Sequence, residues 1–204
     1  TPDLERTFAT HLGSAIELSS DEIDYSTVEQ SSILHLEGYL FEPDNLREVC
    51  YRAMNTAKSN GVLISIDLSD PALVGRIKNI FIEVAEEFAD IIFANEEEAA
   101  SFTGLGGEDM LEAIGMYSSV AVVKLGSRGS MIKSEGNIVK VDAVKTSVVN
   151  TNGAGDMYAA GFLYGITSGQ PIEVAGKIAS YTASFAVASK WARVETVINL
   201  KGII

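Results

Sequence analysis

Short apolar runs alternate with longer amphipathic segments along most of the chain. The apolar runs predict buried strands at residues 33–40, 62–67, 90–94 and 120–124. Between these runs, apolar residues recur at helical spacing after Pro43, after Asp70 and over residues 108–117. Strands that alternate with helices in this way predict an α/β fold. We expect a doubly wound, mainly parallel sheet with helices on both faces.

Helix start and stop signals support this alternation. Asp44 is expected to cap the first of these helices, and the Asn60-Gly61 pair is expected to end it. Asp70 precedes Pro71, which is the arrangement of a cap followed by proline at the first helical position. Cys50 falls on the apolar stripe of the first helix, so we interpret it as a buried packing residue rather than a nucleophile.

The second half of the chain begins with a hairpin pattern and ends with a long helical one. Residues 130–133 and 138–141 predict a β-hairpin that turns at Gly136-Asn137. Residues 147–150 predict another strand, which leads directly into a helix. Residues 171–190 predict a closing helix with a continuous stripe of small and apolar side chains. Trp191 at its end is interpreted as packing rather than stacking on a base.

Length and charge narrow the class of protein. The chain has 204 residues without a linker or repeat, which predicts a single domain over residues 1–204. Its net charge of −13 argues against nucleic acid or an anionic membrane as a partner. One cysteine excludes an internal disulfide framework, so we expect a cytoplasmic protein. The sequence leaves the oligomeric state open, a homodimer included.

The candidate chemistry centres on the segment N-T-N-G-A-G-D, residues 150–156. Gly153, Ala154 and Gly155 have almost no side chain, so their backbone N–H groups can approach a ligand closely. At a helix start these donors and the helix dipole favour an anion. Asp156 is then placed to act as a base for a hydroxyl that attacks a phosphate. A helix N-terminus with small residues for close packing explains the same residues without any ligand.

The longer segment closely resembles the C-terminal signature of the PfkB family of carbohydrate kinases, in its adenosine-kinase-like branch. The resemblance extends from T-N-G-A-G-D to G-F-L-Y-G at residues 161–165. It implies that the amides of Gly153, Ala154 and Gly155 form the anion hole and that Asp156 is the catalytic base. The family usually has Asp where this chain has Asn150, and in several members that carboxylate helps to bind an activating monovalent cation. The resemblance therefore predicts a weakened or lost cation site here.

Two further motifs fit the same family. F-A-N-E-E-E-A-A resembles its N-x-x-E motif, which implies that Asn95 and Glu98 order Mg²⁺ and phosphate through water. Asn at a helix start with Glu three residues later is also an ordinary capping box. K-L-G-S-R-G resembles the family's K-x-G-x-x-G loop along the nucleotide, although a plain hairpin turn explains its glycines. The resemblance implies nucleotide contacts from Asn95 and Asn152, and from Lys124, Gly126, Ser127 and Gly129.

The chain opens with T-P-D-L-E-R-T-F, which resembles the middle of adenosine-kinase-like sequences. We therefore expect that roughly the first third of the family fold, including its lid, is absent. Arg6 in this opening is expected to reach the phosphates.

The prediction is an ATP- and Mg²⁺-dependent kinase that phosphorylates a primary hydroxyl on a nucleoside or sugar. The alternative is a truncated, non-catalytic homologue that binds nucleotide and serves in binding or assembly. A dinucleotide-binding enzyme is disfavoured because no G-x-G-x-x-G opens a βαβ unit.

Overall fold

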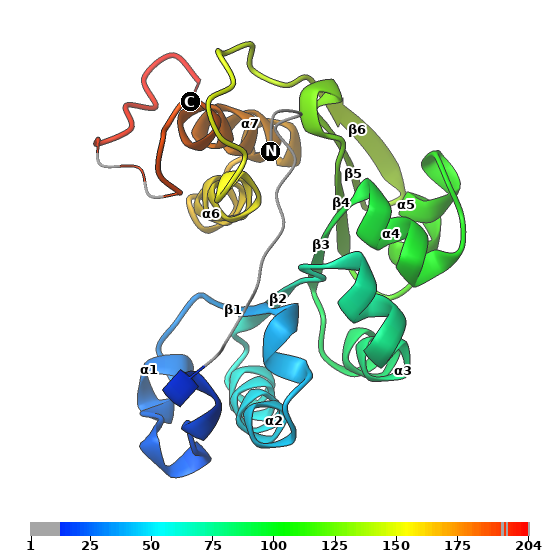
Figure 1. Ribbon diagram of the computed structural model, residues 1–204, viewed down its shortest axis with the longest axis vertical. Helices are drawn as coiled ribbons and strands as arrows, with labels where there is room; N and C mark the ends of the chain where they lie inside the picture. The colour runs from blue at the N-terminus through cyan, green and yellow to red at the C-terminus, as the bar shows by residue number, and fades with distance from the viewer. Residues whose placement is uncertain (1–12, 193, 195, 204) are drawn as a thin grey trace. The chain divides into compact units, whose positions relative to one another are not determined.

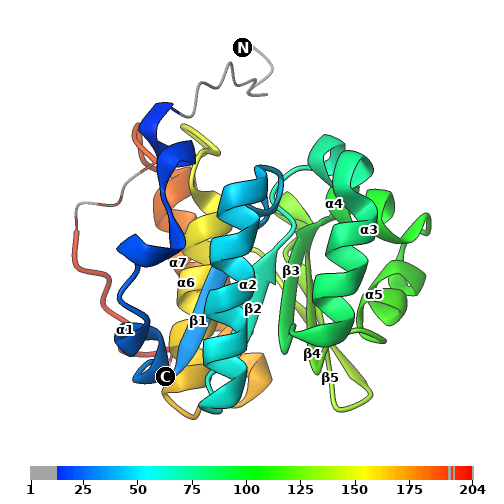
Figure 2. The same cartoon turned by 90° about the horizontal axis from the view of Figure 1, so that it is seen from below.

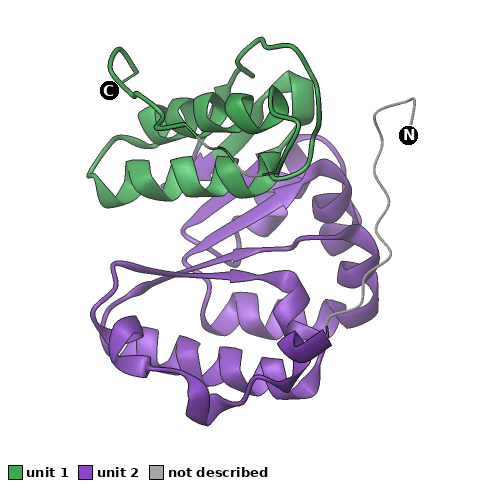
Figure 3. Ribbon diagram, turned by 60° about the vertical axis from the view of Figure 1, so that its left-hand side comes forward, with its two compact units in different colours: residues 1–10, 124–132, 138–204 green, residues 11–123, 133–137 purple. Residues whose placement is uncertain are grey.

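The structure, a computed structural model, describes residues 13–192, 194 and 196–203. These residues form two compact units (Figure 3). Within the described range, unit 2 holds residues up to Val123 together with Lys133–Asn137, and unit 1 holds Lys124–Ile132 and the chain from Ile138 onward. The expectation of a single domain stays a prediction.

Unit 2 alternates strands and helices as the sequence predicts (Figure 1). Its strands are β1 (Ile33–Glu37), β2 (Leu63–Asp67), β3 (Ile91–Asn95) and β4 (Val120–Lys124), the last residue of which belongs to unit 1. Its α-helices are α1 (Tyr25–Glu29), α2 (Asp44–Ser59), α3 (Pro71–Glu87), α4 (Glu96–Thr103) and α5 (Glu108–Ile114). Three 3₁₀ turns accompany them, η1 (Gly13–Glu17), η2 (Ser20–Glu22) and η3 (Gly38–Phe41).

The strands of unit 2 pair in chain order, β1-β2-β3-β4. The β1 and β2 strands are parallel with Ile33 opposite Leu63, and β2 and β3 are parallel with Ser65 opposite Ile91. Helix α2 packs on β1 and β2 (Figure 2) through its apolar stripe, which includes the buried Cys50. Parallel strands joined by helical connections confirm the predicted α/β class.

One of the two predicted helix caps is confirmed and the other is wrong. Asp70 caps α3 as expected, because its side chain accepts a hydrogen bond of 2.7 Å from the Leu73 backbone. The expectation that Asp44 caps α2 is wrong. Asp44 is the first residue of that helix, Pro43 occupies the cap position, and the Asp44 carboxylate pairs instead with Arg47. The positive end of the helix dipole still stabilises an acid at this position.

The predicted strand at 33–40 ends early, at Glu37. Gly38 begins a 3₁₀ turn, and its N–H donates to Ser69 Oγ at 2.8 Å rather than to a strand. A Cβ on Gly38 would lie 2.8 Å from the Leu68 carbonyl oxygen, so only glycine fits this crossing of two loops. Phe41 at the end of the turn is buried edge-on against Phe81, with ring centroids 5.9 Å apart.

Unit 1 is built around two long helices, α6 (Ala154–Thr167) and α7 (Ile172–Val187). Small residues let them approach closely. A Cβ on Gly161 would lie 2.1 Å from Thr182 Oγ1, and one on Gly165 would lie 2.7 Å from Ala175 Cα. The predicted stripe of α7 is confirmed, since Ala175, Ile178, Ala179, Thr182 and Ala186 are all buried.

The hairpin consists of β5 (Ser130–Ser134) and β6 (Asn137–Val141), preceded by a 3₁₀ turn, η4 (Gly126–Arg128). It turns one residue earlier than predicted, at Glu135-Gly136 rather than Gly136-Asn137. Both turn residues have positive φ, 50° and 76° respectively. That pair of angles matches the right-handed twist of the flanking strands, and Asn137 is already the first residue of β6.

The predicted strand at 147–150 is wrong. These residues adopt no regular element, and Val148 and Val149 are about half exposed. The backbone N–H groups of Val149 and Asn150 both donate to the carbonyl of Val187, at 2.9 and 3.2 Å. The acceptor of these two N–H groups is therefore the last residue of helix α7 and not a residue of a neighbouring strand.

Candidate active site

Helix α6 starts within the T-N-G-A-G-D segment, as predicted. Gly153 is its N-cap residue and has a left-handed conformation, with φ 75°. A Cβ at this position would lie 2.5 Å from the Ala192 carbonyl oxygen, so a larger residue would be both strained and obstructed. The amides of the first helical turn lie beyond the reach of intrahelical hydrogen bonds, although Ala154 N–H donates a long bond of 3.3 Å to the Thr151 carbonyl.

Lys124 lies beside this helix start. A Cβ on Gly155 would be 3.4 Å from the Lys124 ammonium nitrogen, so the chain brings two residues predicted for the site into proximity within unit 1. The ammonium charge adds to the positive end of the α6 dipole. An anion with the charge of a phosphate group would be attracted to this place by both.

Asp156 follows as the third residue of α6, and it is exposed to solvent. Its position in the first helical turn is favourable for a carboxylate whether or not a ligand binds. The same position puts a proton acceptor next to the small-residue amides, which suits the deprotonation of an attacking hydroxyl. The geometry within unit 1 is compatible with both interpretations.

Asn152 contributes an acceptor that none of the described residues uses. Its Oδ1 is buried and accepts no hydrogen bond from any residue that the structure describes. Its own N–H donates to Asn150 Oδ1 at 2.9 Å, which shapes the turn into Gly153. Buried acceptors usually have a partner, so this oxygen is suited to a donor on a bound molecule.

The K-L-G-S-R-G segment forms a tight turn. Leu125 N–H donates to the Gly129 carbonyl at 2.7 Å, and Gly129 N–H donates to the Gly126 carbonyl at 3.0 Å. Gly129 has φ 85°, and a Cβ there would lie 1.9 Å from the Val141 carbonyl oxygen, so its role in the fold explains it fully. Gly126 has φ 60°, but a Cβ there would meet nothing within 4 Å. Gly126 and the exposed Ser127 therefore have space beside them for a ligand.

The N-x-x-E motif lies in unit 2, at the junction of β3 and α4. It forms the capping box that the spacing predicts. Asn95 Oδ1 accepts from Glu98 N at 2.8 Å, and the Glu98 carboxylate accepts from Asn95 N and Asn95 Nδ2, each at 2.6 Å. Glu98 is 3% exposed. Because each carboxylate oxygen already accepts one bond, a metal would fit here through intervening water rather than by displacing the cap.

The strands predicted at 62–67, 120–124 and 147–150 each end in a polar residue, and Asn95 follows the one predicted at 90–94. Three of these four residues end strands in the structure. Asp67 ends β2, Asn95 ends β3 and Lys124 ends β4. Asn150 is the exception, because it follows an irregular segment rather than a strand. Because α/β sheets bind ligands at the carboxyl ends of their strands, the positions of Asp67, Asn95 and Lys124 are suited to ligand contacts.

Two hydroxyl contacts beneath the α6 start were not anticipated. Thr182 Oγ1 in α7 lies 2.8 Å from the Met157 carbonyl in α6 and 3.0 Å from the carbonyls of Ile178 and Ala179 in its own helix, so these acceptors share its one proton. The sequence indicated only its place on an apolar stripe. Ser130 Oγ and Tyr158 Oη lie 2.7 Å apart in the interior, and burial raises the pKa of Tyr158 to about 12. Tyr158 therefore stays neutral and supports the helix rather than acting as a base. Gly161, which leaves room for Thr182, was the available sequence signal.

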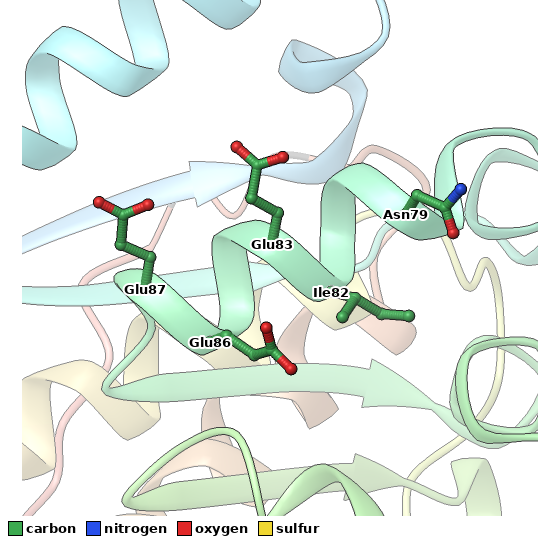
Figure 4. A pocket seen from close by; sticks show the side chains of 5 residues that line it. All are labelled: Asn79, Ile82, Glu83, Glu86 and Glu87. Atoms are coloured by element: carbon green, nitrogen blue, oxygen red, sulfur yellow. The ribbon is translucent and has the colours of Figure 1, made fainter.

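A hollow of about 570 Å³ lies elsewhere, against the outer side of α3 (Figure 4). It is lined by Asn79, Ile82, Glu83, Glu86 and Glu87. Its three carboxylates would repel a phosphate group, so we do not assign the nucleotide to it. Within the described ranges, no cluster of three or more His, Cys, Asp or Glu side chains could hold a metal, and no helix has the length and apolar character to cross a membrane.

Two expectations remain, one for Trp191 and one for Arg6. Trp191 is 69% exposed, so its interpretation as a packing residue is wrong. Its ring lies largely in solvent, in the chain that follows the end of α7 at Val187. Arg6 lies outside the described residues.

Comparison with known proteins gives the family. The chain is 28% identical over 178 residues to a 5-dehydro-2-deoxygluconokinase of Listeria innocua, covering 83% of this chain and 55% of that protein. A probable sugar kinase from Rhizobium etli superposes with a TM-score of 0.86 at 30% identity, over 89% of this chain and 56% of the other. The adenosine kinase from Sinorhizobium meliloti gives a TM-score of 0.85 at 32% identity, over 89% and 56%.

The chain thus spans about half the length of the curated relatives that it matches. The family model for pfkB family carbohydrate kinases matches residues 1–196. On that match, the chain belongs to the pfkB family of carbohydrate kinases.

Proposed function

We propose that this chain provides the nucleotide-binding and phosphoryl-transfer part of an ATP-dependent kinase that acts on a primary hydroxyl of a sugar or nucleoside. The observation that carries the proposal is the start of α6. There the small residues 153–155, the Lys124 ammonium and the Asp156 carboxylate are held within one unit. A phosphate-binding helix start with an adjacent proton acceptor is the minimum that phosphoryl transfer to a hydroxyl requires.

Each residue has a distinct task in this proposal. The amides of Gly153, Ala154 and Gly155 stabilise charge on the transferring group, and Lys124 adds a point charge beside them. Asp156 accepts the proton of the attacking hydroxyl. ATP supplies the phosphoryl group when it is bound.

The nucleotide itself is proposed to lie along the K-L-G-S-R-G turn. Gly126 and Ser127 face open space and are suited to this contact. Asn152 offers its buried Oδ1 to a donor on the nucleotide or on the substrate. Gly129 takes part through the shape of the turn rather than through a contact of its own.

Glu98 and Asn95 are proposed to orient Mg²⁺ through water. Their hydrogen bonds fix the carboxylate in one orientation, as a group that positions metal-bound water needs to be. Mg²⁺ retains several waters in most protein sites, which agrees with an outer-sphere role for this pair. When bound, the ion would neutralise phosphate charge.

The names of the relatives support the proposed substrate class. These names include a 5-dehydro-2-deoxygluconokinase, a sugar kinase and an adenosine kinase. The decisive experiment measures ADP release by the full-length protein with ATP and Mg²⁺, using 5-dehydro-2-deoxygluconate, simple sugars and adenosine in parallel. Turnover with at least one of these alcohols is expected, and ATP hydrolysis without any phosphorylated product would refute the proposal.

A non-catalytic nucleotide-binding module is the second candidate. The α6 start also suits anion binding alone, because small residues and an acid in the first helical turn are favourable without any reaction. The presence of Asp156 beside the anion hole argues for catalysis, because a module that only binds ATP has no need of a base there. Tight ATP binding by the full-length protein without phosphoryl transfer to any tested alcohol would select this candidate.

A further inference from the structure

The loop that carries the candidate anion hole rests against the chain segment that follows helix α7. Val149 and Asn150 donate their backbone N–H groups to the carbonyl of Val187. Gly153 approaches the carbonyl of Ala192 so closely that a Cβ would lie 2.5 Å from its oxygen. Residues 187–192 therefore form a support for residues 149–153, and both belong to unit 1.

The side chain of Asn150 joins the two segments. Its Nδ2 donates to the carbonyl of Lys190 at 3.2 Å, and its Oδ1 accepts from Asn152 N at 2.9 Å. An amide side chain has a donor end and an acceptor end, and here each end has a backbone partner. The bond to Asn152 fixes the turn that leads into Gly153, and the bond to Lys190 fixes that turn relative to α7.

We propose that Asn150 is a positioning residue for phosphoryl transfer: its amide holds the loop from Asn152 to Gly155 in the geometry that the transferring group requires. The inference rests on the kinase function proposed above. Asn150 acts through the loop, since both ends of its side chain bond to the chain itself. A displacement of an anion hole by about 1 Å can lower turnover by roughly 100-fold, so a modest pair of bonds has a large kinetic effect.

The same bonds could serve only to stabilise the fold, and kinetics separate the two roles. A positioning residue acts on the transition state, so Asn150→Ala in the full-length protein should lower kcat by roughly 10- to 100-fold with little change in KM for ATP. The matched control is Asn137→Ala in the hairpin, which also removes an Nδ2 bond to a backbone carbonyl, that of Glu135 at 3.3 Å. The control should leave kcat and KM at their parent values.

Amide hydrogen exchange tests the geometry without any need for activity. Asn150→Ala should speed exchange in residues 149–157 by roughly 5- to 150-fold, the scale of two lost hydrogen bonds, while helix α7 stays protected. Unchanged exchange in 149–157, or unchanged kcat in an active parent, would overturn the proposal. Faster exchange throughout both helices would also overturn it, since Asn150 would then be a residue of general stability.

The two hypotheses fail separately. If the parent protein transfers no phosphoryl group, the proposed function is wrong, and the exchange measurement still decides whether Asn150 orders the loop. If Asn150→Ala does not fold, Asn150→Ser takes its place with a smaller expected fall in kcat, because a serine hydroxyl can still accept from the Asn152 N–H while the bond to the Lys190 carbonyl is lost. An unchanged kcat of this variant would again overturn the proposal.

Discussion

Replacing Asp156 by Asn separates catalysis from helix capping most directly. The substitution keeps the size of the side chain and removes its charge and basicity. If Asp156 accepts the proton of the attacking hydroxyl, the full-length protein should lose turnover by roughly 10²–10⁴-fold. That range corresponds to about 2.7–5.4 kcal/mol in the activation free energy.

The structural alternative predicts a much smaller effect of a different kind. Asp156 is an exposed acid in the first turn of α6, so the loss of its charge removes a dipole interaction of at most about 1 kcal/mol. In a chain of this size, such a change lowers Tm by roughly 2–4 °C. ATP affinity should hold or increase in either case, because a negative charge near the phosphates is removed.

The assay is steady-state kinetics with a separate measurement of ATP binding and of Tm. The matched control is Asp109→Asn, which removes an exposed acid from the first turn of α5. The control should keep normal turnover. Near-normal turnover of Asp156→Asn, with only a small fall in Tm, would refute the proposed mechanism and leave the helix start as its full explanation.

Four further predictions follow from the same observations. The turnover defect of Glu98→Gln should be partly recovered by more Mg²⁺, and kinetics over a Mg²⁺ series that show no recovery would contradict its metal role. The 204-residue chain should bind ATP with Mg²⁺ more readily than adenosine or a sugar, and calorimetry showing the reverse order would count against the assigned nucleotide motifs. Turnover of the full-length protein should respond little to K⁺, whereas turnover of the Asn150→Asp variant should respond more. In that variant a carboxylate would face the Lys190 carbonyl and favour a cation between them. Strong K⁺ activation of the unmodified protein would contradict this prediction. Burial raises the pKa of Cys50 to about 12, so the folded chain should resist labelling by iodoacetamide at mildly alkaline pH. The thiol of the unfolded chain ionises at that pH and reacts. Rapid labelling of the folded chain would show that the thiol is accessible.

Features that depend on residues close together in the chain could be predicted from the sequence. The Asp70-Pro71 start and the Asn95–Glu98 box each depend on atoms three residues apart, so the residue types suffice to predict the bonds. Asp44 shows the limit of such signals. An acid at the cap and an acid in the first turn are both favourable, and only the backbone of Pro43 decides which position Asp44 occupies.

Contacts between distant residues were beyond the pattern of the sequence. Residues 147–150 have the β-branched composition of a strand, but the carbonyl that receives their N–H groups belongs to Val187, at the end of a helix. The approach of Lys124 to Gly155 likewise joins residues 31 positions apart, the difference of their numbers, and no local periodicity encodes it. The only sequence signal for that pair was the resemblance of the K-L-G-S-R-G and T-N-G-A-G-D motifs to those of the PfkB family.

The glycines of those motifs show why a motif match and a ligand contact are different claims. Gly129 and Gly153 both have positive φ, and both face a backbone carbonyl too closely for any Cβ. Their identity is therefore required by the fold, whether or not a nucleotide binds. Gly126 also needs positive φ, yet it has open space beside it, and Gly155 has the Lys124 ammonium as its neighbour. A substitution at Gly155 thus tests the ligand more specifically than one at Gly126, Gly129 or Gly153, where a loss of activity would follow from backbone strain alone.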